Sequence, residues 1–181
     1  MPHGTRRPLI LQAPRYPSCM PDAFDLLSQP AVFDLDPAAL EAAYLRAAAA
    51  THPDRFDDPL EQADAADRAA AVTTAHAQLK DPEKRARVLL GRLGVTTDAG
   101  GSPPPALLME VMEVREELES ALQEQDDAEV TRLRGWAETR RTGHLDKLST
   151  LFAAEPVDTD TVIAQLNALR YMQRMLDQFD A

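Results

Sequence analysis

Asp-Pro pairs followed by apolar residues at helical spacing limit this chain to a helical fold. Asp36-Pro37 and Asp81-Pro82 are strong helix starts, because aspartate caps free backbone N–H groups and proline fits the first helical position. After the first pair, Leu40, Tyr44 and Ala47 recur every three or four residues, which places them on one face of a helix. The sequence contains no alternating β-branched stretch of the kind that forms strands. These patterns predict an all-α fold.

The same signals predict four helices in the first half of the chain and three longer ones in the second. The expected ranges are near residues 22–29, 37–51, 60–79, 82–91, 105–125, 127–152 and 158–179. The second and third of these form an antiparallel pair joined by a loop. Short connections between the last three predict antiparallel neighbours in a three-helix bundle.

Composition along the chain predicts two domains and a linker. Gly, Ser and Pro concentrate between Thr96 and Pro105, which is typical of a linker. Before Asp22 the chain has five prolines and no acidic residue, which predicts a loose tail. We therefore expect a tail at residues 1–21, a first domain at 22–94, a linker at 95–105 and a three-helix domain at 106–181.

Charge and cysteine content narrow the range of partners. The formal net charge of -11 argues against nucleic acid, because phosphate binding needs a concentrated basic face. One basic cluster is interpreted as a solvated helix surface: Lys80, Lys84, Arg85, Arg87 and Arg92. No apolar run approaches the roughly 20 residues that span a bilayer. The single Cys19 permits no internal disulfide, which fits a reducing cytoplasm. We therefore expect a cytoplasmic protein, and from its charge and apolar runs we expect no nucleic-acid or membrane partner.

Catalysis is not indicated by any motif. A helical bundle with enzymatic activity could be a di-iron carboxylate oxidase, but the Glu-x-x-His pairs that such a site needs do not occur in the sequence. His3, His52, His76 and His144 lack the spacing of metal ligands. Cys19 lies in the proline-rich tail and is a poor candidate nucleophile. We therefore predict no catalytic residue, no metal site and no cofactor.

His52-Pro53-Asp54 lies at the bend between the second and third predicted helices. Pro53 fixes its own backbone and excludes His52 from helical geometry, so the bend is rigid and its side chains point outward. Rigid presentation lowers the ordering cost of binding, and Asp54 suits a charge-assisted bond to an arginine of a partner. The alternative is an ordinary loop in which Asp54 caps the next helix.

The bend and its surroundings resemble the J-domain, the module that stimulates ATP hydrolysis by chaperones of the DnaK class. The resemblance rests on His52-Pro53-Asp54, the short helix before it and the segment from Lys80 to Ala86 after it. It implies that His52, Pro53 and Asp54 contact the chaperone, with Arg46 and Arg55 supplying basic charge.

Some positions depart from the family pattern. Thr51 stands where an aromatic residue is common, Thr73 where an asparagine is common, and the second helix keeps only Arg46 of several basic residues. These departures weaken the expected electrostatic attraction to the chaperone. We therefore expect Arg46 and Arg55 to share this task, with Arg85 as a further candidate.

The first long helix after the linker carries apolar residues on two faces. A stripe at helical spacing predicts its buried side, formed by Leu107, Val111, Val114, Leu118 and Leu122. Leu108, Met109 and Met112 lie off this stripe beside Glu113 and Glu116, which favours a partner surface. Tyr171 likewise lies opposite a predicted core stripe of Val162, Leu166, Leu169 and Leu176. The alternative is that neighbouring helices bury both faces.

The segment from Ala106 to Leu118 is similar to the start of the C-terminal domain of HscB-type (Jac-type) co-chaperones of iron-sulfur cluster assembly. In that family the corresponding apolar and acidic residues bind the scaffold protein IscU. The resemblance therefore implies a scaffold-binding face of Leu108, Met109, Met112, Glu113, Glu116 and Tyr171. Ser120 stands at a position where the family can carry another acid.

The resemblance as a whole implies a co-chaperone that stimulates the ATPase of a DnaK/HscA-class chaperone and delivers IscU to it. The alternative is a J-domain co-chaperone of another type that delivers a different client protein. Those proteins usually carry a Gly/Phe-rich linker or repeated Cys-x-x-Cys zinc modules, and this sequence has neither.

Overall fold

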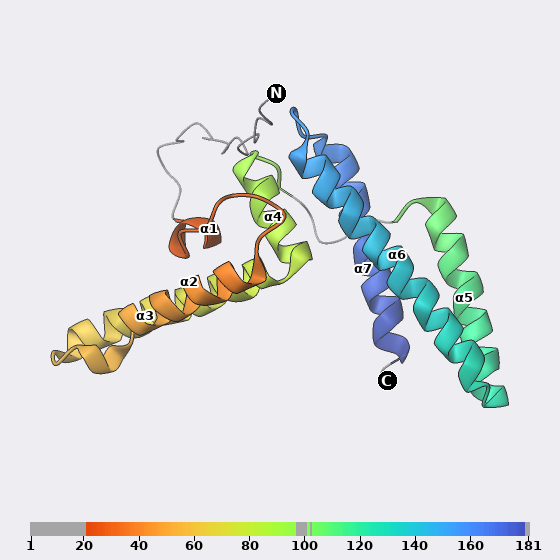
Figure 1. Ribbon diagram of the computed structural model, residues 1–181, viewed down its shortest axis with the longest axis horizontal. Helices are drawn as coiled ribbons and strands as arrows, with labels where there is room; N and C mark the ends of the chain where they lie inside the picture. Colours follow the sequence, from red (N-terminus) through yellow and green to blue (C-terminus); the bar gives the residue numbers. More distant parts are fainter. Residues whose placement is uncertain (1–20, 97–100, 102, 180–181) are drawn as a thin grey trace, which may run out of the picture. The chain divides into compact units, whose positions relative to one another are not determined.

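The computed structural model describes residues 21–96, 101 and 103–179 (Figure 1). These residues form seven α-helices and one 3-10 turn, with no β-strand among them, which confirms the all-α prediction. The helices are α1 (Ala23–Leu26), α2 (Pro37–Ala50), α3 (Pro59–Lys80), α4 (Pro82–Arg92), α5 (Pro105–Glu124), α6 (Asp127–Ala153) and α7 (Thr159–Phe179), and the turn η1 is Pro53–Arg55. The predicted tail before Pro21, with His3 and Cys19, lies outside the described residues.

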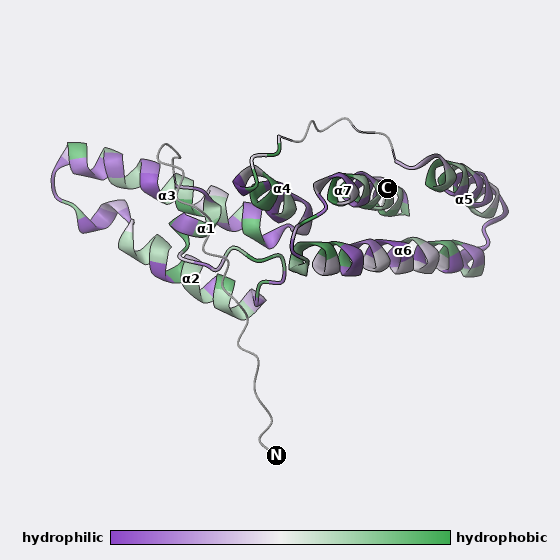
Figure 2. Ribbon diagram, turned by 90° about the horizontal axis from the view of Figure 1, so that it is seen from above, coloured by the Kyte–Doolittle hydropathy of each residue, from purple (hydrophilic) through white to green (hydrophobic). Residues whose placement is uncertain are grey.

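The chain divides into two compact units between Lys84 and Arg85, so α4 begins in the first and lies mostly in the second. The predicted domain limits of 22–94, 95–105 and 106–181 stay a prediction. Figure 2 shows apolar and hydrophilic bands alternating along the helices of both units, as expected for helices that each bury one face.

Aspartate caps start the helices of the first unit where the sequence predicts them. Asp22, Asp36, Asp58 and Asp81 each accept a hydrogen bond from the backbone N–H two residues later, at 2.9, 2.9, 2.8 and 2.8 Å. Each bond satisfies one of the free donors of a first helical turn and contributes about 1 kcal/mol. These local caps explain why the helix starts could be predicted without any knowledge of the tertiary structure.

The first unit is an antiparallel hairpin of α2 and α3, with α1 packed against α3 (Figure 1). Its buried apolar side chains include Phe24, Phe33, Leu40, Val72 and Leu79. A fully buried side chain of this size contributes roughly 1.5–3 kcal/mol. Burial of Val72, Ala75 and Leu79 confirms the predicted core face of the third helix.

A polar contact also joins the two arms of the hairpin. Nε2 of His76 on α3 lies 3.1 Å from Oε2 of Glu41 on α2, and its ring stacks on Tyr44 with centroids 4.2 Å apart. His76 is therefore a satisfied, half-buried histidine, as expected from its lack of metal-ligand spacing.

The second unit contains the three-helix bundle, in which α6 packs against both α5 and α7. The core is formed by Leu107, Val111, Val114, Leu118, Leu133, Ala137, Ala168, Met172 and Met175. Two arginines of α6 reach carboxylates of α5: Arg140 lies 2.6 Å from Glu110, and Arg132 lies 2.7 Å from Glu117. Arg132 also pairs with Glu129 at 2.6 Å, which raises the pKa of Arg132 and lowers that of Glu129. These pairs show that α5 and α6 are antiparallel.

The prediction that Leu122 belongs to the buried stripe of α5 is wrong, because this side chain is 58% exposed. Nε of Arg115 donates to Oε1 of Gln178 at 3.2 Å, which aligns that turn of α5 with the end of α7. Leu122 lies two turns beyond Arg115, whereas the described part of α7 ends at Phe179. No described residue of α7 is therefore level with Leu122, and Ala121 is the buried residue of this turn.

The core stripe of α7 is broader than predicted. Val162, Leu166 and Leu169 are buried as predicted, but Leu176 is only partly buried. Met172 and Met175, which the stripe did not include, are almost completely buried. The unbranched methionine side chain adapts to irregular spaces, and both methionines belong to the core that α5, α6 and α7 share.

Candidate functional site

The helix before the bend ends as its sequence requires. The Thr51 hydroxyl donates to the carbonyl of Ala47 at 2.9 Å and closes the last turn of α2. His52 then takes an extended conformation, with φ -66° and ψ 127°, because the following Pro53 excludes helical geometry. Thr51 therefore completes the helix end at the position where the J-domain family commonly has an aromatic residue.

His52 and Asp54 are both presented to solvent, with side chains 61% and 89% exposed. The backbone N–H of Asp54 donates to Nδ1 of His52 at 3.3 Å. The same Nδ1 lies 3.7 Å from Oδ2 of Asp54, so Nε2 is the ring nitrogen that faces away from these contacts. The cap of α3 is Asp58, whose carboxylate accepts from Leu60 and Glu61. Asp54 therefore does not cap α3, and the role of the bend in binding a chaperone stays a prediction.

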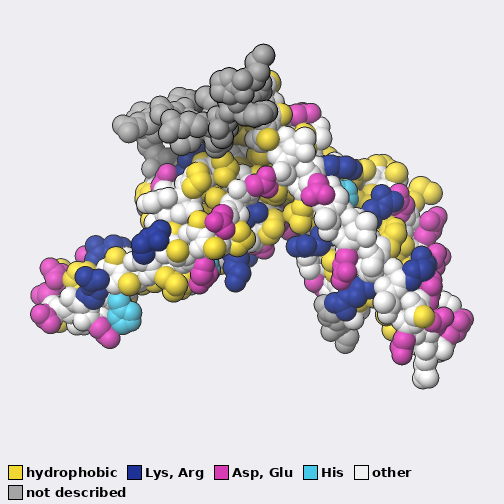
Figure 3. Space-filling model, viewed as in Figure 1, with side chains coloured by type: hydrophobic (Ala, Val, Ile, Leu, Met, Phe, Trp, Pro, Cys, Tyr) yellow, Lys and Arg dark blue, Asp and Glu magenta, His cyan; other side chains and the backbone are white. Residues whose placement is uncertain are grey.

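Side chains on both sides of the bend hold it in place. Nη1 of Arg55 donates to the carbonyl of Ala49 at 3.1 Å, at the end of α2. On the other side, Gln62 donates to the carbonyl of Phe56 at 2.8 Å, and the guanidinium of Arg68 lies 5.7 Å from the Phe56 ring centroid. The bend is thus fixed to both helices, and Figure 3 shows charged side chains of both signs at this tip of the hairpin.

Arg46 and Arg55, the predicted basic contacts, are both exposed near the bend. Arg55 already uses one N–H group in its bond to Ala49, so its position is fixed by the helix end. Their role in binding the chaperone stays a prediction.

The predicted scaffold-binding residues of α5 lie on its open side. Leu108, Met109 and Met112 are 38%, 66% and 55% exposed, and Glu113 and Glu116 beside them are exposed as well. The alternative in which neighbouring helices bury both faces of α5 is therefore wrong. Exposed apolar side chains next to acids are typical of partner surfaces, but the assignment to a scaffold protein stays a prediction.

Helix register brings Tyr171 to the same level as Leu108. Since α5 and α7 each run antiparallel to α6, they run parallel to one another. The bond from Arg115 to Gln178 fixes which turns of α5 and α7 lie at the same level. Leu108 precedes Arg115 by two turns, and Tyr171 precedes Gln178 by two turns. Tyr171 is half-buried, and the guanidinium of Arg174 lies 5.9 Å from its ring centroid. The sequence placed these residues on separate helices, and the structure aligns them.

Comparison with known proteins gives a consistent result. A family model described as the HSCB C-terminal oligomerisation domain matches residues 103–180. The co-chaperone protein HscB homolog of Bordetella parapertussis is 40% identical over 138 residues, which cover 72% of this chain and 78% of that protein. The chain belongs to the HscB family of co-chaperones. The HscB homolog of Bordetella petrii is 42% identical over 113 residues, and the match spans 65% of its length.

Solved structures agree with this membership. The chaperone HscB from Vibrio cholerae has a TM-score of 0.79 at 26% identity, covering 88% of this chain and 95% of that one. The human co-chaperone protein HscB has a TM-score of 0.80 at 22% identity, covering 99% and 93%, and shows the fold alone. The predicted J-domain followed by a three-helix bundle is thereby confirmed as the HscB arrangement.

The sequence did not reveal an ion pair beside the exposed face of Leu108, Met109 and Met112. Glu110 lies between Met109 and Val111 on α5 and pairs with Arg140 of α6, whose guanidinium lies 5.6 Å from the Trp136 ring centroid. This pair could not be found from the sequence, because it depends on which turns of α5 and α6 face each other. It fixes the first half of α5 to α6 and leaves Met109 and Met112 pointing outward.

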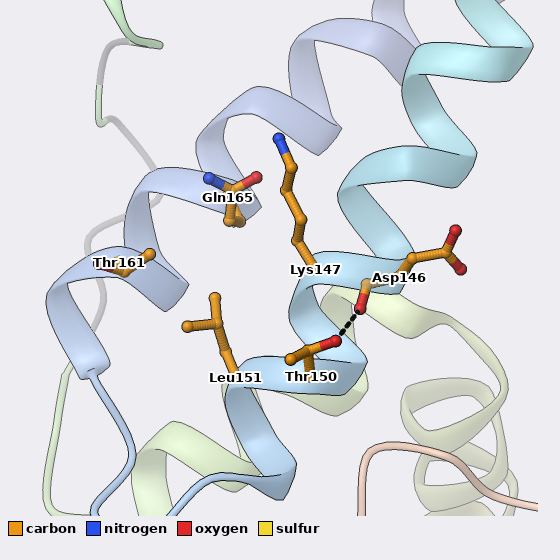
Figure 4. A pocket seen from close by; sticks show the side chains of 6 residues that line it. All are labelled: Asp146, Lys147, Thr150, Leu151, Thr161 and Gln165. Carbon is orange, nitrogen blue, oxygen red and sulfur yellow. Dashed lines mark hydrogen bonds between the residues drawn. The ribbon is translucent and has the colours of Figure 1, made fainter.

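A depression lies between α6 and α7 of this HscB-family protein (Figure 4). Its lining is formed by Asp146, Lys147, Thr150, Leu151, Thr161 and Gln165. Asp146 points away from the other labelled side chains in Figure 4, and Oε1 of Gln165 lies 2.8 Å from Nδ1 of His144. No cluster of His, Cys, Asp or Glu that could hold a metal occurs among the described residues. Within the same residues, no helix is both long and apolar enough to cross a membrane.

Proposed function

We propose that this HscB-family protein stimulates the ATPase of a DnaK/HscA-class chaperone and delivers the iron-sulfur scaffold IscU to it. The observation that carries the proposal is that two different surfaces are open at once. The first is the rigid bend of His52, Pro53 and Asp54 in one unit, and the second is the apolar face of Leu108 and Met112 in the other. We also propose the J-domain at 22–94 and the scaffold-binding domain at 106–181, joined by the linker at 95–105.

The chaperone half of the proposal rests on the geometry of the bend. The exposed Asp54 carboxylate can accept two parallel N–H bonds from an arginine, and such charge-assisted bonds are about twice as strong as neutral ones. Nε2 of His52 is available beside it for a further hydrogen bond. Because Arg55 and Gln62 already hold the bend, little conformational entropy is lost on binding.

The scaffold half rests on the face formed by α5 and α7. Burial of Leu108, Met109 and Met112 against a partner removes apolar surface from water, and methionine adapts to the shape that it meets. Glu113 and Glu116 stand beside these residues and suit basic side chains of the scaffold. Tyr171 completes the face from α7, with an apolar ring and a hydroxyl that can hydrogen-bond.

The two halves act together through their covalent connection. When the second domain holds the scaffold, the linker keeps the J-domain near it, so the chaperone meets the scaffold at a raised effective concentration. Engagement of the bend then triggers ATP hydrolysis, which closes the chaperone on the scaffold. In these steps the protein itself makes and breaks no covalent bond.

The chaperone half is tested by the ATPase rate of the chaperone in the presence of scaffold. Asp54→Asn removes the charge of the bend, and we expect stimulation to fall by about tenfold or more. Asp57→Asn is the matched control, because Asp57 is an exposed carboxylate three residues away in the same loop. Equal stimulation by Asp54→Asn and the unchanged protein would remove the J-domain assignment.

The scaffold half is tested by capture of IscU on the immobilised protein. The triple variant Leu108→Ala/Met112→Ala/Tyr171→Ala is expected to lose capture, whereas Leu122→Ala is expected to keep it. Leu122 is a matched control, because it is exposed on the same helix but lies beyond the level of Tyr171. Undiminished capture by the triple variant would refute the face. ATPase stimulation without any capture by the unchanged protein would instead favour a different client.

A further inference from the structure

The backbone before α5 lies directly against two side chains of α7. The carbonyl of Gly101 accepts a hydrogen bond from Nη2 of Arg170 at 2.8 Å, and this nitrogen also lies 3.3 Å from Oδ1 of Asn167. A Cβ atom at Gly101 would lie 2.8 Å from Cγ of Asn167 and still closer to its amide nitrogen. A side chain at this position would displace the end of the Asn167 side chain. Gly101, Asn167 and Arg170 therefore form one close contact, here called the Gly101 seat.

The start of α5 has no cap of the ordinary kind. Its N-cap residue is Pro104, which offers no side-chain acceptor to the free N–H groups of the first turn. Pro103 is buried, so the chain is packed against the bundle immediately before the helix begins. The position of the first turn of α5 is therefore set by tertiary contacts, and the Gly101 seat supplies a polar one.

The Gly101 seat and the candidate scaffold-binding face share one turn of α7. Asn167, Arg170 and Tyr171 are three and four residues apart, so they lie on neighbouring positions of the same helical surface. On α5, Leu108 follows Gly101 by seven residues and is level with Tyr171 through the register of Arg115 and Gln178. A shift of the chain at Gly101 would therefore move Leu108 relative to Tyr171.

We propose that Gly101 and Arg170 are positioning residues for the scaffold-binding face, which they set by holding the start of α5 level with Tyr171, while Asn167 packs against Gly101. This inference rests on the proposed function, since it concerns the same face. The three residues touch the chain that leads into α5 and need no contact with the partner. Their loss changes how well the two sides of the face align.

The test compares Gly101→Ala, Asn167→Ala and the double variant in the full-length protein. Gly101→Ala places the new Cβ against the end of the Asn167 side chain, which must move away, so we expect the Kd for IscU to rise several-fold. In the double variant, Asn167→Ala leaves room for the Cβ, and the bond from Arg170 to the carbonyl of residue 101 is kept, so most of the affinity is expected to return. ATPase stimulation of the chaperone without scaffold is expected to be the same for all variants, because the bend lies in the other unit.

A measurement without any partner follows the start of α5 directly. Amide hydrogen exchange at Leu108 and Val111 is expected to be faster in Gly101→Ala than in the unchanged protein, and to recover in the double variant. Arg170→Gln keeps the glycine and removes the charged donor of the seat. This variant tests the same contact if Gly101→Ala fails to fold. Faster exchange and weaker IscU binding are expected for this variant too.

The outcomes separate this inference from the proposed function. If the unchanged protein binds IscU and the Leu108→Ala/Met112→Ala variant does not, while Gly101→Ala and Arg170→Gln bind normally, the Gly101 seat has no positioning role. A failure of the double variant to recover would likewise overturn it. If the unchanged protein does not bind IscU at all, the proposed function fails, and unaltered exchange at Leu108 would then overturn the seat independently.

Discussion

Individual side chains at the bend show how a short motif gains a fixed shape. Pro53 sets the backbone, Asp58 rather than Asp54 caps α3, and Arg55 binds the end of α2. The tripeptide and its proline constraint were evident from the sequence. The bonds of Arg55 and Gln62 were not, because each joins residues six positions apart across a turn whose path the sequence does not specify.

A charge prediction belongs to these residues. Arg46 and Arg55 are exposed cations near the bend, so they should attract an acidic chaperone surface, and salt should weaken that attraction. We expect the double variant Arg46→Ala/Arg55→Ala to bind the chaperone several-fold more weakly at low salt and to show a flatter dependence between roughly 0.05 and 0.5 M salt. Fluorescence anisotropy of labelled protein against chaperone would measure both.

The control for this experiment is Arg134→Ala, which removes an exposed cation of α6 in the other unit. It changes the net charge by one unit without altering the two predicted contacts. A salt dependence of the double variant that matches the unchanged protein would show that neither arginine contributes to docking.

At the scale of helices, local signals predicted far more than the contacts between helices. The Asp-Pro starts placed α2 and α4, and the apolar periods placed α5, α6 and α7, within a few residues of their observed limits, because these signals act locally. The exposure of Leu122, the burial of Met172 and the Glu110–Arg140 pair depend on the relative register of neighbouring helices. A single sequence does not specify that register.

The observed register of α5 predicts that two leucines of the same predicted stripe contribute very differently to stability. Leu118 is 5% exposed and Leu122 is 58% exposed, although they lie one turn apart on α5. Leu118→Ala removes buried surface and leaves a cavity, so we expect it to lower the free energy of unfolding by about 2–5 kcal/mol. Leu122→Ala should change it by less than about 0.5 kcal/mol. Urea unfolding followed by circular dichroism would measure both, and equal losses would contradict the assigned register.

For the whole molecule, the two open surfaces lie in units that the chain connects, and each is assigned to a different partner. A single sequence predicted both surfaces, since each depends on a local pattern: a proline-fixed tripeptide in one case and apolar residues off a helical stripe in the other. It did not reveal the Gly101 seat, because that contact brings together residues separated by more than sixty positions.

Connection of the two surfaces predicts a specific kind of inhibition. Full-length Asp54→Asn should still capture IscU through Leu108 and Met112 but should fail to trigger hydrolysis. An excess of it over the unchanged protein is therefore expected to lower the scaffold-dependent ATPase rate of the chaperone, in proportion to the share of scaffold that it holds. Adding Leu108→Ala/Met112→Ala to the same chain should abolish this inhibition, because the scaffold then stays with the unchanged protein. Inhibition that persists in the combined variant would mean that the bend still binds the chaperone unproductively, and that the two surfaces do not act through a shared scaffold.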